Sequence, residues 1–208
     1  MPIDTSANSN VLLTGSQISQ LSSLEVQTSS GSSVAFGSLI NPSTGNHSKT
    51  LVVALRHFWC GLCKAYLTQL CEQIPESVAK EHGMNIVVLG CGSWEPIKDY
   101  AATTNCPYPI YADPTKKVYQ TLGTTSTMAH TPSGQPRKSY LKESMFTQAM
   151  GSLKVALTNV GSVNKVGSFK QNGGEFIFES GPINIFAHRM QNTEDHTEIA
   201  EIIDMLSV

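Results

Sequence analysis

Two cysteines separated by two residues carry the most specific chemical signal in the chain. Cys60 and Cys63 lie in the segment RHFWCGLCKAY, which follows the apolar run TLVVAL. A pair at this spacing can form a redox-active dithiol, supply half of a zinc site, or fill a core as two small apolar side chains. A second such pair and a spaced pair of histidines are both missing from the sequence. We therefore expect no metal site.

The position of the two cysteines indicates different roles for them. The apolar run before them predicts a buried strand, and the residues after them predict a helix. Cys60 then lies at the helix start, where unpaired N–H groups and the helix dipole stabilise a thiolate. Cys63 lies one turn further along the same face, within reach of a disulfide. We expect Cys60 to attack the substrate, and Cys63, with the higher pKa, to resolve the product.

Two arginines and two glycines complete the predicted site. A guanidinium beside a thiolate lowers the pKa of the thiol and can bind a substrate oxygen, which is the role we expect for Arg56 and Arg189. An ordinary surface ion pair explains each arginine equally well. Gly173 and Gly174 precede the last predicted hairpin. Without side chains, the backbone there can approach a ligand closely or adopt a positive φ.

The other residues with chemical potential receive smaller roles. Cys71 is expected to be a small buried apolar side chain on the core face of the helix, and Cys106 a loop residue without a role. Cys91 ends a neighbouring strand, at the edge where α/β sheets bind ligands, and its approach to the site is left open. We expect His57 to have a packing role and His130 to lie on the solvated surface.

The pattern of the remaining chain predicts alternating strands and helices. Strands are expected over 50–55, 84–92, 108–113, 174–180 and 183–189, and a short hairpin within 24–40. Helices are expected over 11–21, 61–82 with a break at Pro75, 94–104, 114–123, 143–160 and 194–206, and a long loop over 124–140.

This order of elements predicts a thioredoxin-like fold. It is an α/β three-layer sandwich with a mixed central sheet, helices on both faces and an N-terminal β-hairpin. We expect residues 1–20 to form a polar, partly mobile segment and residues 21–208 to form a single domain. Whether the loop over 124–140 closes over the cysteines is left open.

Composition excludes several classes of protein. The 208 residues carry a net charge of -2 without a basic stripe, so nucleic acid is not an expected partner. No apolar run approaches the roughly 20 residues needed to span a bilayer, and the first residues lack the pattern of a secretory signal. Five cysteines are an odd number, which favours thiols kept reduced over a disulfide scaffold. We expect a cytoplasmic protein that does not bind membranes.

Two segments together resemble a known family. RHFWCGLCKAY and GGEFIFESGPINIFAHRMQNTEDH are similar to the peroxiredoxin-like 2 group, also called the AhpC/TSA antioxidant-domain-containing family. The shared features are Arg-His-Phe before the cysteines, Lys64 and Tyr66 after them, the Gly-Gly pair, and His-Arg followed by Asp-His. The resemblance covers roughly residues 20–206. It implies a thioredoxin fold, a cytoplasmic location, and thiol-dependent reduction of a peroxide or, in one branch, of a prostaglandin endoperoxide.

The resemblance also implies the partners of the reaction. No bound cofactor is expected, because an external thiol such as thioredoxin or glutathione would reduce the Cys60–Cys63 disulfide. Arg56, His57 and Phe58 stand where peroxiredoxins usually carry Thr and Pro, and the Gly-Gly pair stands where thioredoxins carry a cis-proline. These departures favour a small-molecule substrate over a protein disulfide. Two other functions stay open: a biosynthetic enzyme for one metabolite, and a non-catalytic binding module. A homodimer is also left open.

Overall fold

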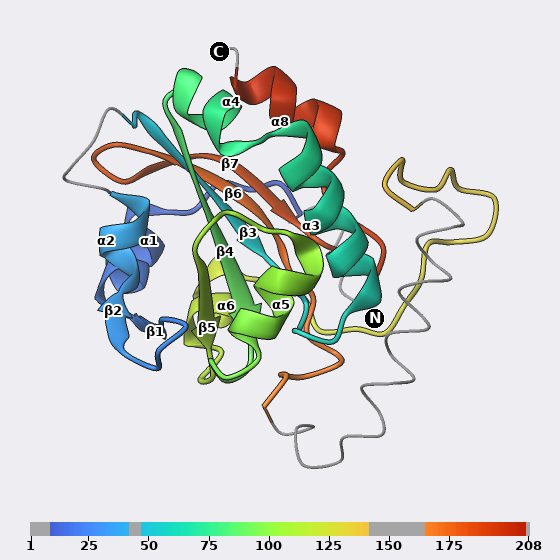
Figure 1. Ribbon diagram of the computed structural model, residues 1–208, viewed down its shortest axis with the longest axis horizontal. Coiled ribbons are helices and arrows are strands. Elements are labelled where there is room, and N and C mark those ends of the chain that lie inside the picture. The colour runs from blue at the N-terminus through green and yellow to red at the C-terminus, as the bar shows by residue number, and fades with distance from the viewer. Residues whose placement is uncertain (1–8, 42–46, 142–164, 207–208) are drawn as a thin grey trace.

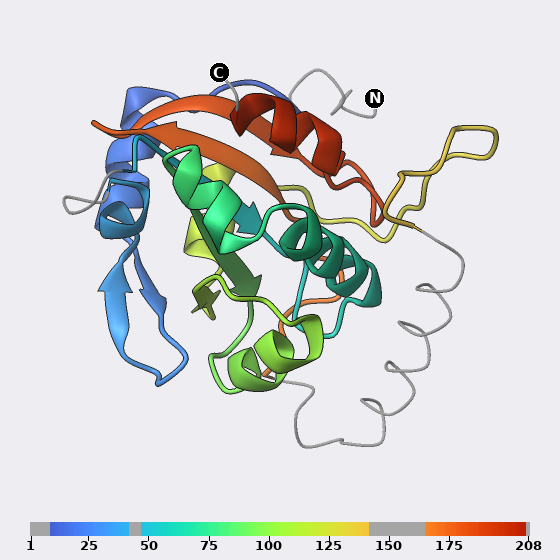
Figure 2. The same cartoon turned by 45° about the horizontal axis from the view of Figure 1, so that its top comes forward.

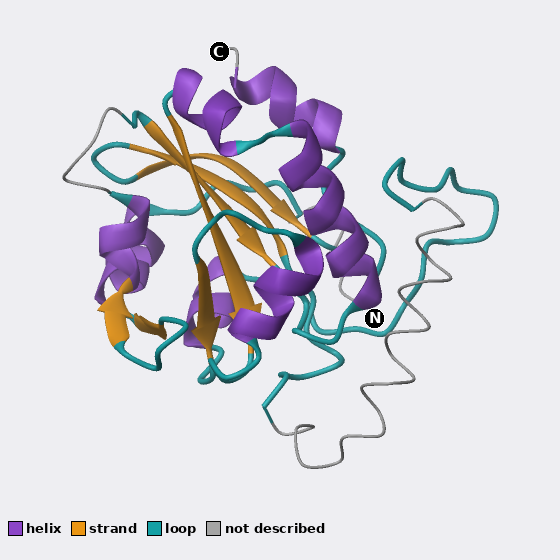
Figure 3. Ribbon diagram, viewed as in Figure 1, coloured by secondary structure: helices purple, strands orange, loops and turns teal. Residues whose placement is uncertain are grey.

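A seven-stranded mixed sheet forms the centre of the molecule (Figure 1, Figure 3). The structure is a computed structural model that describes residues 9–41, 47–141 and 165–206. The strands are β1 (Glu25–Gln27), β2 (Ser33–Ala35), β3 (Lys49–Ala54), β4 (Met84–Cys91), β5 (Ile110–Asp113), β6 (Gly174–Glu179) and β7 (Ile183–Arg189). The helices are α1 (Gly15–Ser23), α2 (Phe36–Ile40), α3 (Gly61–Gln73), α4 (Glu76–Glu81), α5 (Ile97–Thr104), α6 (Lys117–Leu122) and α8 (Ile199–Leu206).

The strand order confirms the predicted topology. The sheet runs β2-β1-β5-β4-β3-β6-β7. Strands β3, β4 and β5 are parallel neighbours, whereas β6 pairs antiparallel with β3 and β7 pairs antiparallel with β6. The N-terminal hairpin β1–β2 extends the opposite edge through antiparallel pairing of β1 with β5. The carboxyl ends of β3 and β4 therefore meet at one edge, where α/β sheets place their sites.

Helices cover both faces of the sheet, which makes three layers (Figure 2). Alternate side chains of β3 enter different cores, because successive residues of a strand point to opposite faces. Leu51 and Val53 pack on the side of α3, α4, α5 and α8, while Val52 and Ala54 pack on the side of α1, α2 and α6. The thioredoxin-like sandwich predicted from the sequence is confirmed. Within the described ranges, no helix is long and apolar enough to cross a membrane.

Several elements begin or end where a local hydrogen bond dictates. Helix α1 starts at Gly15 rather than at residue 11, because Thr14 and Gln17 form a reciprocal capping box there. The residues before it lie beside β7, where the N–H of Arg189 donates to the carbonyl of Ser9. Residues 1–8, part of the segment expected to be mobile, lie outside the described residues.

Other boundaries also differ from the expected ones. The second strand of the hairpin ends at Ala35, since Phe36 and Ile40 are buried by the short helix α2 instead. Helix α6 starts three residues after Pro114, because the Asp113 carboxylate accepts a hydrogen bond from the N–H of Val118. The C-terminal helix starts at residue 199 rather than 194, since residues 194–197 make polar contacts of their own. Pro75 separates α3 from α4, as predicted. The helix expected over 143–160 lies outside the described residues.

Candidate active site

The two cysteines lie at the junction of β3 and α3. Cys60 is the N-cap residue of α3, and its sulfur accepts a hydrogen bond from the N–H of Cys63 at 3.2 Å. The sulfur of Cys63 lies 3.5 Å from the N–H of Arg56. Both thiols are buried, Cys60 being 3% exposed. The helix start thus places one sulfur among unpaired N–H groups, and the other one turn deeper.

Arg56 brings a positive charge to the first of these sulfurs. Its Nη1 lies 3.7 Å from the sulfur of Cys60. The guanidinium is fixed by two further hydrogen bonds, from Nε to Oδ1 of Asn172 at 3.1 Å and from Nη2 to the carbonyl of Phe169 at 2.6 Å. Because the side chain is almost fully buried, solvent screens its charge weakly.

These contacts give the two thiols different acidities. Burial raises the pKa of Cys60, but the hydrogen bonds from Cys63 and the charge of Arg56 outweigh it and lower the pKa to about 6. For Cys63, burial and the hydrogen bond with Cys60 act in the same direction and raise the pKa well above its usual value. Cys60 is therefore the more acidic of the two thiols and the one that carries the thiolate. This is the order of acidity that we expected from the sequence.

A cavity of about 680 Å³ opens over Cys60. Its volume falls within the range of small-molecule sites. Arg56 and Cys60 belong to its lining, together with apolar side chains that include Trp59, Leu62 and Phe169. The loop over 124–140 contributes a large part of the remaining wall, including residues 130–135. This loop therefore forms one side of the cavity.

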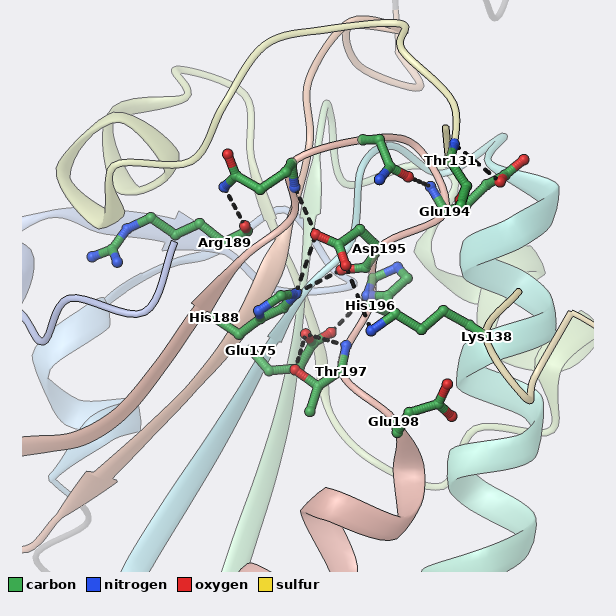
Figure 4. Close-up of polar contacts among 12 residues, drawn as sticks. Thr131, Lys138, Glu175, His188, Arg189, Glu194, Asp195, His196, Thr197 and Glu198 are labelled. Atoms are coloured by element: carbon green, nitrogen blue, oxygen red, sulfur yellow. Dashed lines mark hydrogen bonds and ion pairs between the residues drawn. The ribbon is translucent and has the colours of Figure 1, made fainter. Parts of the chain in front are cut away.

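Hydrogen bonds to the segment after β7 hold this loop in place. The N–H of Thr193 donates to the carbonyl of Ala129 at 2.9 Å. The carboxylate of Glu194 accepts from the N–H of Thr131 at 3.3 Å (Figure 4). It also contacts Nδ1 of His130 at 3.3 Å. His130 is exposed, as expected, but it also lines the cavity.

Arg189 does not lie at the thiolate, contrary to the expectation. Its Nε donates to the carbonyl of Leu122 at 2.5 Å, and its Nη1 donates to the carbonyl of Val11 at 2.8 Å. The guanidinium also lies over the ring of Phe176, 5.5 Å from its centroid, in the core on the α6 side of the sheet. In Figure 4 the side chain extends away from the cluster around Glu175. The hydrogen bonds of Arg189 thus connect α6 and the N-terminal segment to the end of β7.

The two glycines serve the sheet rather than the cavity. A Cβ on Gly173 would overlap the carbonyl of Ala54, and a Cβ on Gly174 would overlap the carbonyl of His188. Within the described ranges, neither glycine lines the cavity over Cys60. Their lack of side chains lets the start of β6 pass closely between β3 and β7. The approach to a ligand that the sequence suggested for these glycines is thus replaced by a close approach to the backbone of the neighbouring strands.

A buried carboxylate and imidazole lie beneath α3, and the sequence reasoning assigned them no role. Glu175 and His196 are both fully buried, with 2.6 Å between Oε1 and Nδ1 (Figure 4). The other carboxylate oxygen accepts from the N–H and the hydroxyl of Thr197, at 3.0 and 2.9 Å. The ring of His196 stacks on Tyr66 at 4.2 Å, and its charge helps to lower the pKa of Cys60.

The sequence contained a signal for this pair. Glu175 interrupts an apolar strand, and a buried carboxylate needs a partner of opposite charge. Burial raises the pKa of Glu175, but the charge and the hydrogen bond of His196 prevail, so its pKa is lowered. The Asp-His dipeptide noted in the family resemblance supplies that partner.

The remaining candidates lie at the edge of the site or away from it. His57 lines the cavity, but burial and the charge of Arg56 lower its pKa to about 3, so the ring is neutral and packs on Phe169. Cys91 packs in the core on the α6 side, and burial raises its pKa. Among the described residues, Cys91, Cys71 and Cys106 are not part of the cavity wall.

Comparison with known proteins agrees with this geometry. Residues 67–192 match the family model described as AhpC/TSA antioxidant enzyme. Peroxiredoxin-like 2C of Mus musculus is 31% identical over 185 residues, covering 89% of this chain and 78% of that protein. Peroxiredoxin-like 2C of Takifugu rubripes is 32% identical over 180 residues, covering 86% and 76%.

Solved structures show the same fold at low sequence identity. Peroxiredoxin Q of Xanthomonas campestris matches with a TM-score of 0.56 at 9% identity, over 91% of this chain and 92% of that one. A cysteine-to-serine mutant of peroxiredoxin 6 of Arenicola marina matches with a TM-score of 0.54 at 15% identity, over 89% and 69%.

The sheet and the thiol pair define the class of protein, a thioredoxin-like α/β protein related to the peroxiredoxins. The chain belongs to the AhpC/TSA antioxidant enzyme family. This is a family of the thiol-oxidoreductase type. The matched residues of the family model begin after Cys63, so the roles of the two cysteines rest on the geometry described above.

Proposed function

We propose that the protein is a thiol-dependent oxidoreductase that reduces a peroxide or an endoperoxide through Cys60 and Cys63. The proposal rests on one observation, the environment of the Cys60 sulfur. It lies in the wall of a shielded cavity, with Nη1 of Arg56 at 3.7 Å and the N–H of Cys63 at 3.2 Å. These two donors stabilise the attacking thiolate, and a positive charge at this position also stabilises an oxyanion leaving from the substrate.

The first step bonds one substrate oxygen to the Cys60 sulfur. The Cys60 thiolate attacks one peroxide oxygen, the O–O bond breaks, and the other oxygen takes up a proton. With a hydroperoxide, that oxygen leaves as water or an alcohol and Cys60 becomes a sulfenic acid; with an endoperoxide, both oxygens stay on the substrate, which is then bound to Cys60 as a sulfenate ester. Cys63 attacks the Cys60 sulfur, so that the S–S bond forms, the S–O bond breaks, and water or the diol leaves. Two electrons have passed from the two sulfurs to the substrate, and an external thiol returns them by exchange.

The cavity favours a small apolar substrate. Trp59, Leu62, Met128 and Phe169 contribute apolar surface to its lining, and the loop over 124–140 forms part of its wall. A folded protein has little access to a cysteine that is 3% exposed, whereas a small peroxide fits within 680 Å³. The same argument favours a small thiol such as glutathione over thioredoxin as the reductant. A cytoplasmic location, where such thiols are kept reduced, accompanies this proposal.

A biosynthetic reaction on one particular metabolite is the second candidate. The size of the cavity supports it, because an enzyme for simple peroxides needs no walls that select a larger molecule. The two candidates share the chemistry of Cys60 and differ in the substrate. A non-catalytic binding module is disfavoured, since it gives no reason for a Cys60 pKa of about 6.

Peroxide consumption in the presence of excess glutathione tests the proposal. We expect turnover in the wild type and in Cys91→Ser, whose sulfur lies outside the cavity. Cys60→Ser should consume peroxide much more slowly than the wild type. When glutathione is left out, Cys63→Ser should complete the first oxidation and stop at a sulfenic acid on Cys60 that dimedone traps. Normal turnover in both Cys60→Ser and Cys63→Ser would overturn the proposal. Turnover of one bulky peroxide but not of hydrogen peroxide or a small alkyl hydroperoxide would favour the biosynthetic candidate.

A further inference from the structure

Cys71 and Cys106 form a second pair of thiols outside the cavity. Cys71 lies in the second half of α3, and Cys106 lies in the connection between α5 and β5. Both are free and partly exposed, and both pack against the core on the α3 side of the sheet. Neither has a role predicted from the sequence, because 35 positions separate them and only the fold brings their segments together.

The pair lies beside a hollow of its own. This hollow of about 360 Å³ is lined by Cys71 and by Thr104, Asn105 and Pro107, the residues on either side of Cys106. Helices α3 and α5 pack against each other here, and they lie side by side in both views (Figure 1, Figure 2). Because both cysteines are also partly exposed, a small oxidant can approach them without entering the cavity over Cys60.

Hydrogen bonds fix the two segments relative to each other. The hydroxyl of Tyr108 donates to the carbonyl of Ile74, at the end of α3. The N–H of Cys106 donates to the carbonyl of Ala101, which ties the same turn to α5. The turn that carries Cys106 is thus anchored both to its own helix and to the helix that carries Cys71.

The two thiols differ in acidity. A hydrogen bond from Cys71 lowers the pKa of Cys106, although burial opposes this. The same hydrogen bond raises the pKa of Cys71, and burial adds to the effect. Cys106 is thus the more acidic of the two thiols, and Cys71 retains its proton as the neighbouring resolving thiol.

We propose that Cys71 and Cys106 are a second redox site, which forms a disulfide when the protein meets hydrogen peroxide. The Cys106 thiolate attacks one oxygen, the O–O bond breaks, and the other oxygen takes a proton and leaves as water. Cys71 then attacks the sulfenic sulfur of Cys106; the S–S bond forms, the S–O bond breaks, and a second water leaves. Each sulfur gives up one electron, and a thiol reductant restores both. The reaction needs neither Cys60 nor Cys63 and does not depend on the function proposed for them.

The disulfide would join the helix that carries Cys60 and Cys63 to the α5–β5 connection. A cross-link between residues 71 and 106 restricts the unfolded chain, and it should raise the melting temperature of the oxidised protein by about 5–10 °C. The site thus couples the redox state of the surroundings to the rigidity of α3.

Peptide mapping of the double variant Cys60→Ser/Cys63→Ser tests this proposal, because the first pair is then silent. The protein is treated with hydrogen peroxide, its remaining thiols are alkylated in denaturant, and it is digested with trypsin. Cleavage after Lys and Arg places Cys71 on peptide 65–80, Cys91 on 81–98 and Cys106 on 99–116. We expect 65–80 to be linked to 99–116, a link lost on reduction, while 81–98 is alkylated.

Two further variants in the same background sharpen the result. Cys71→Ser should leave a sulfenic acid on Cys106 that dimedone traps, and Cys91→Ser should leave the link unchanged. The same map on the wild type gives the answer if the double variant does not fold. Recovery of Cys71 and Cys106 as alkylated thiols, under conditions that fully oxidise Cys60 and Cys63 in the wild type, would overturn the proposal. So would a link from either peptide to 81–98.

Discussion

Replacing Arg56 with Met should raise the pKa of Cys60 and shift the pH at which this thiol becomes reactive. Met keeps much of the length and volume of the side chain but removes the charge that lies 3.7 Å from the sulfur. The thiolate then keeps the hydrogen bonds from Cys63 and loses its neighbouring cation.

The size of the shift follows from the contacts. The Cys60 pKa lies at about 6 instead of 9.0, and three pK units correspond to about 4 kcal/mol. An ion pair at 3.7 Å is worth at most about 4.5 kcal/mol at an effective dielectric constant of 20. The Cys63 hydrogen bonds share the stabilisation, and water that replaces the guanidinium recovers part of it. We therefore expect Arg56→Met to raise the pKa by about 1–2 units, to about 7–8.

The rate of alkylation by iodoacetamide, measured as a function of pH, reads out this shift. In a Cys63→Ser background, Cys60 should be followed through the mass of its tryptic peptide. This is peptide 57–64 where residue 56 is Arg or Lys, and peptide 50–64 in Arg56→Met, which lacks the cleavage site. The midpoint of the profile is the informative quantity. A thiolate of higher pKa is intrinsically more nucleophilic, so the plateau at high pH should rise while the midpoint moves upward.

Two further substitutions separate charge from structure. Arg56→Lys keeps the charge but loses the hydrogen bonds to Asn172 and Phe169, and its midpoint should stay closer to that of the wild type than to that of Arg56→Met. Arg137→Met removes an exposed cation from the same cavity wall, and its midpoint should hardly change. An unchanged midpoint in Arg56→Met, or an equal shift in Arg137→Met, would refute the role given to Arg56.

Three other substitutions test the surroundings of the site. Gly173→Ala should lower the free energy of unfolding by about 1–3 kcal/mol, because its Cβ meets the carbonyl of Ala54, whereas Gly15→Ala, with open space around it, should be neutral; equal urea midpoints would contradict this. Glu175→Gln should cost about 3–5 kcal/mol at pH 7. Because the pKa of this carboxyl is lowered in the folded protein, its contribution to the free energy of unfolding is complete above its unfolded-state pKa. That contribution is lost as the pH falls through the lower, folded-state pKa. The difference from wild type should therefore shrink in urea unfolding near pH 3, and a constant difference would exclude an ionised carboxylate. Glu194→Ala should speed hydrogen exchange in the loop over 124–140, and unchanged exchange there would show that other contacts hold the loop.

The fold could be predicted from the sequence because its signals are local. Continuous apolar runs such as residues 50–55 specify buried parallel strands, and Pro75 breaks the helix where its missing N–H dictates. The N-cap position of Cys60 follows from the same order of elements. The boundaries that differ depend on side chains instead. Thr14 caps α1 four residues later than expected, and the contacts of residues 194–197 delay the last helix.

The site could be predicted only in part, because local sequence patterns do not specify contacts between residues that are far apart in the chain. Arg56 is close in sequence to Cys60, so the short distance between them can be inferred from the chain alone. Arg189 also carries a guanidinium, but β7 directs it to the carbonyls of Leu122 and Val11 on the other side of the sheet. The approach of Cys106 to Cys71 depends on how α5 packs on α3, which no spacing in the sequence reveals.

The most direct measurement is the mass of peptide 57–64 after the protein has reacted with one equivalent of peroxide. This peptide contains both Cys60 and Cys63. With Cys60 as attacker and Cys63 as resolver, it should lose two hydrogen atoms, resist alkylation, and regain two alkylable thiols on reduction. The same peptide from Cys63→Ser should carry a dimedone adduct on Cys60. Recovery of peptide 57–64 with two free thiols, while the peroxide has been consumed by a protein that carries Cys71→Ser and Cys106→Ser, would contradict this mechanism.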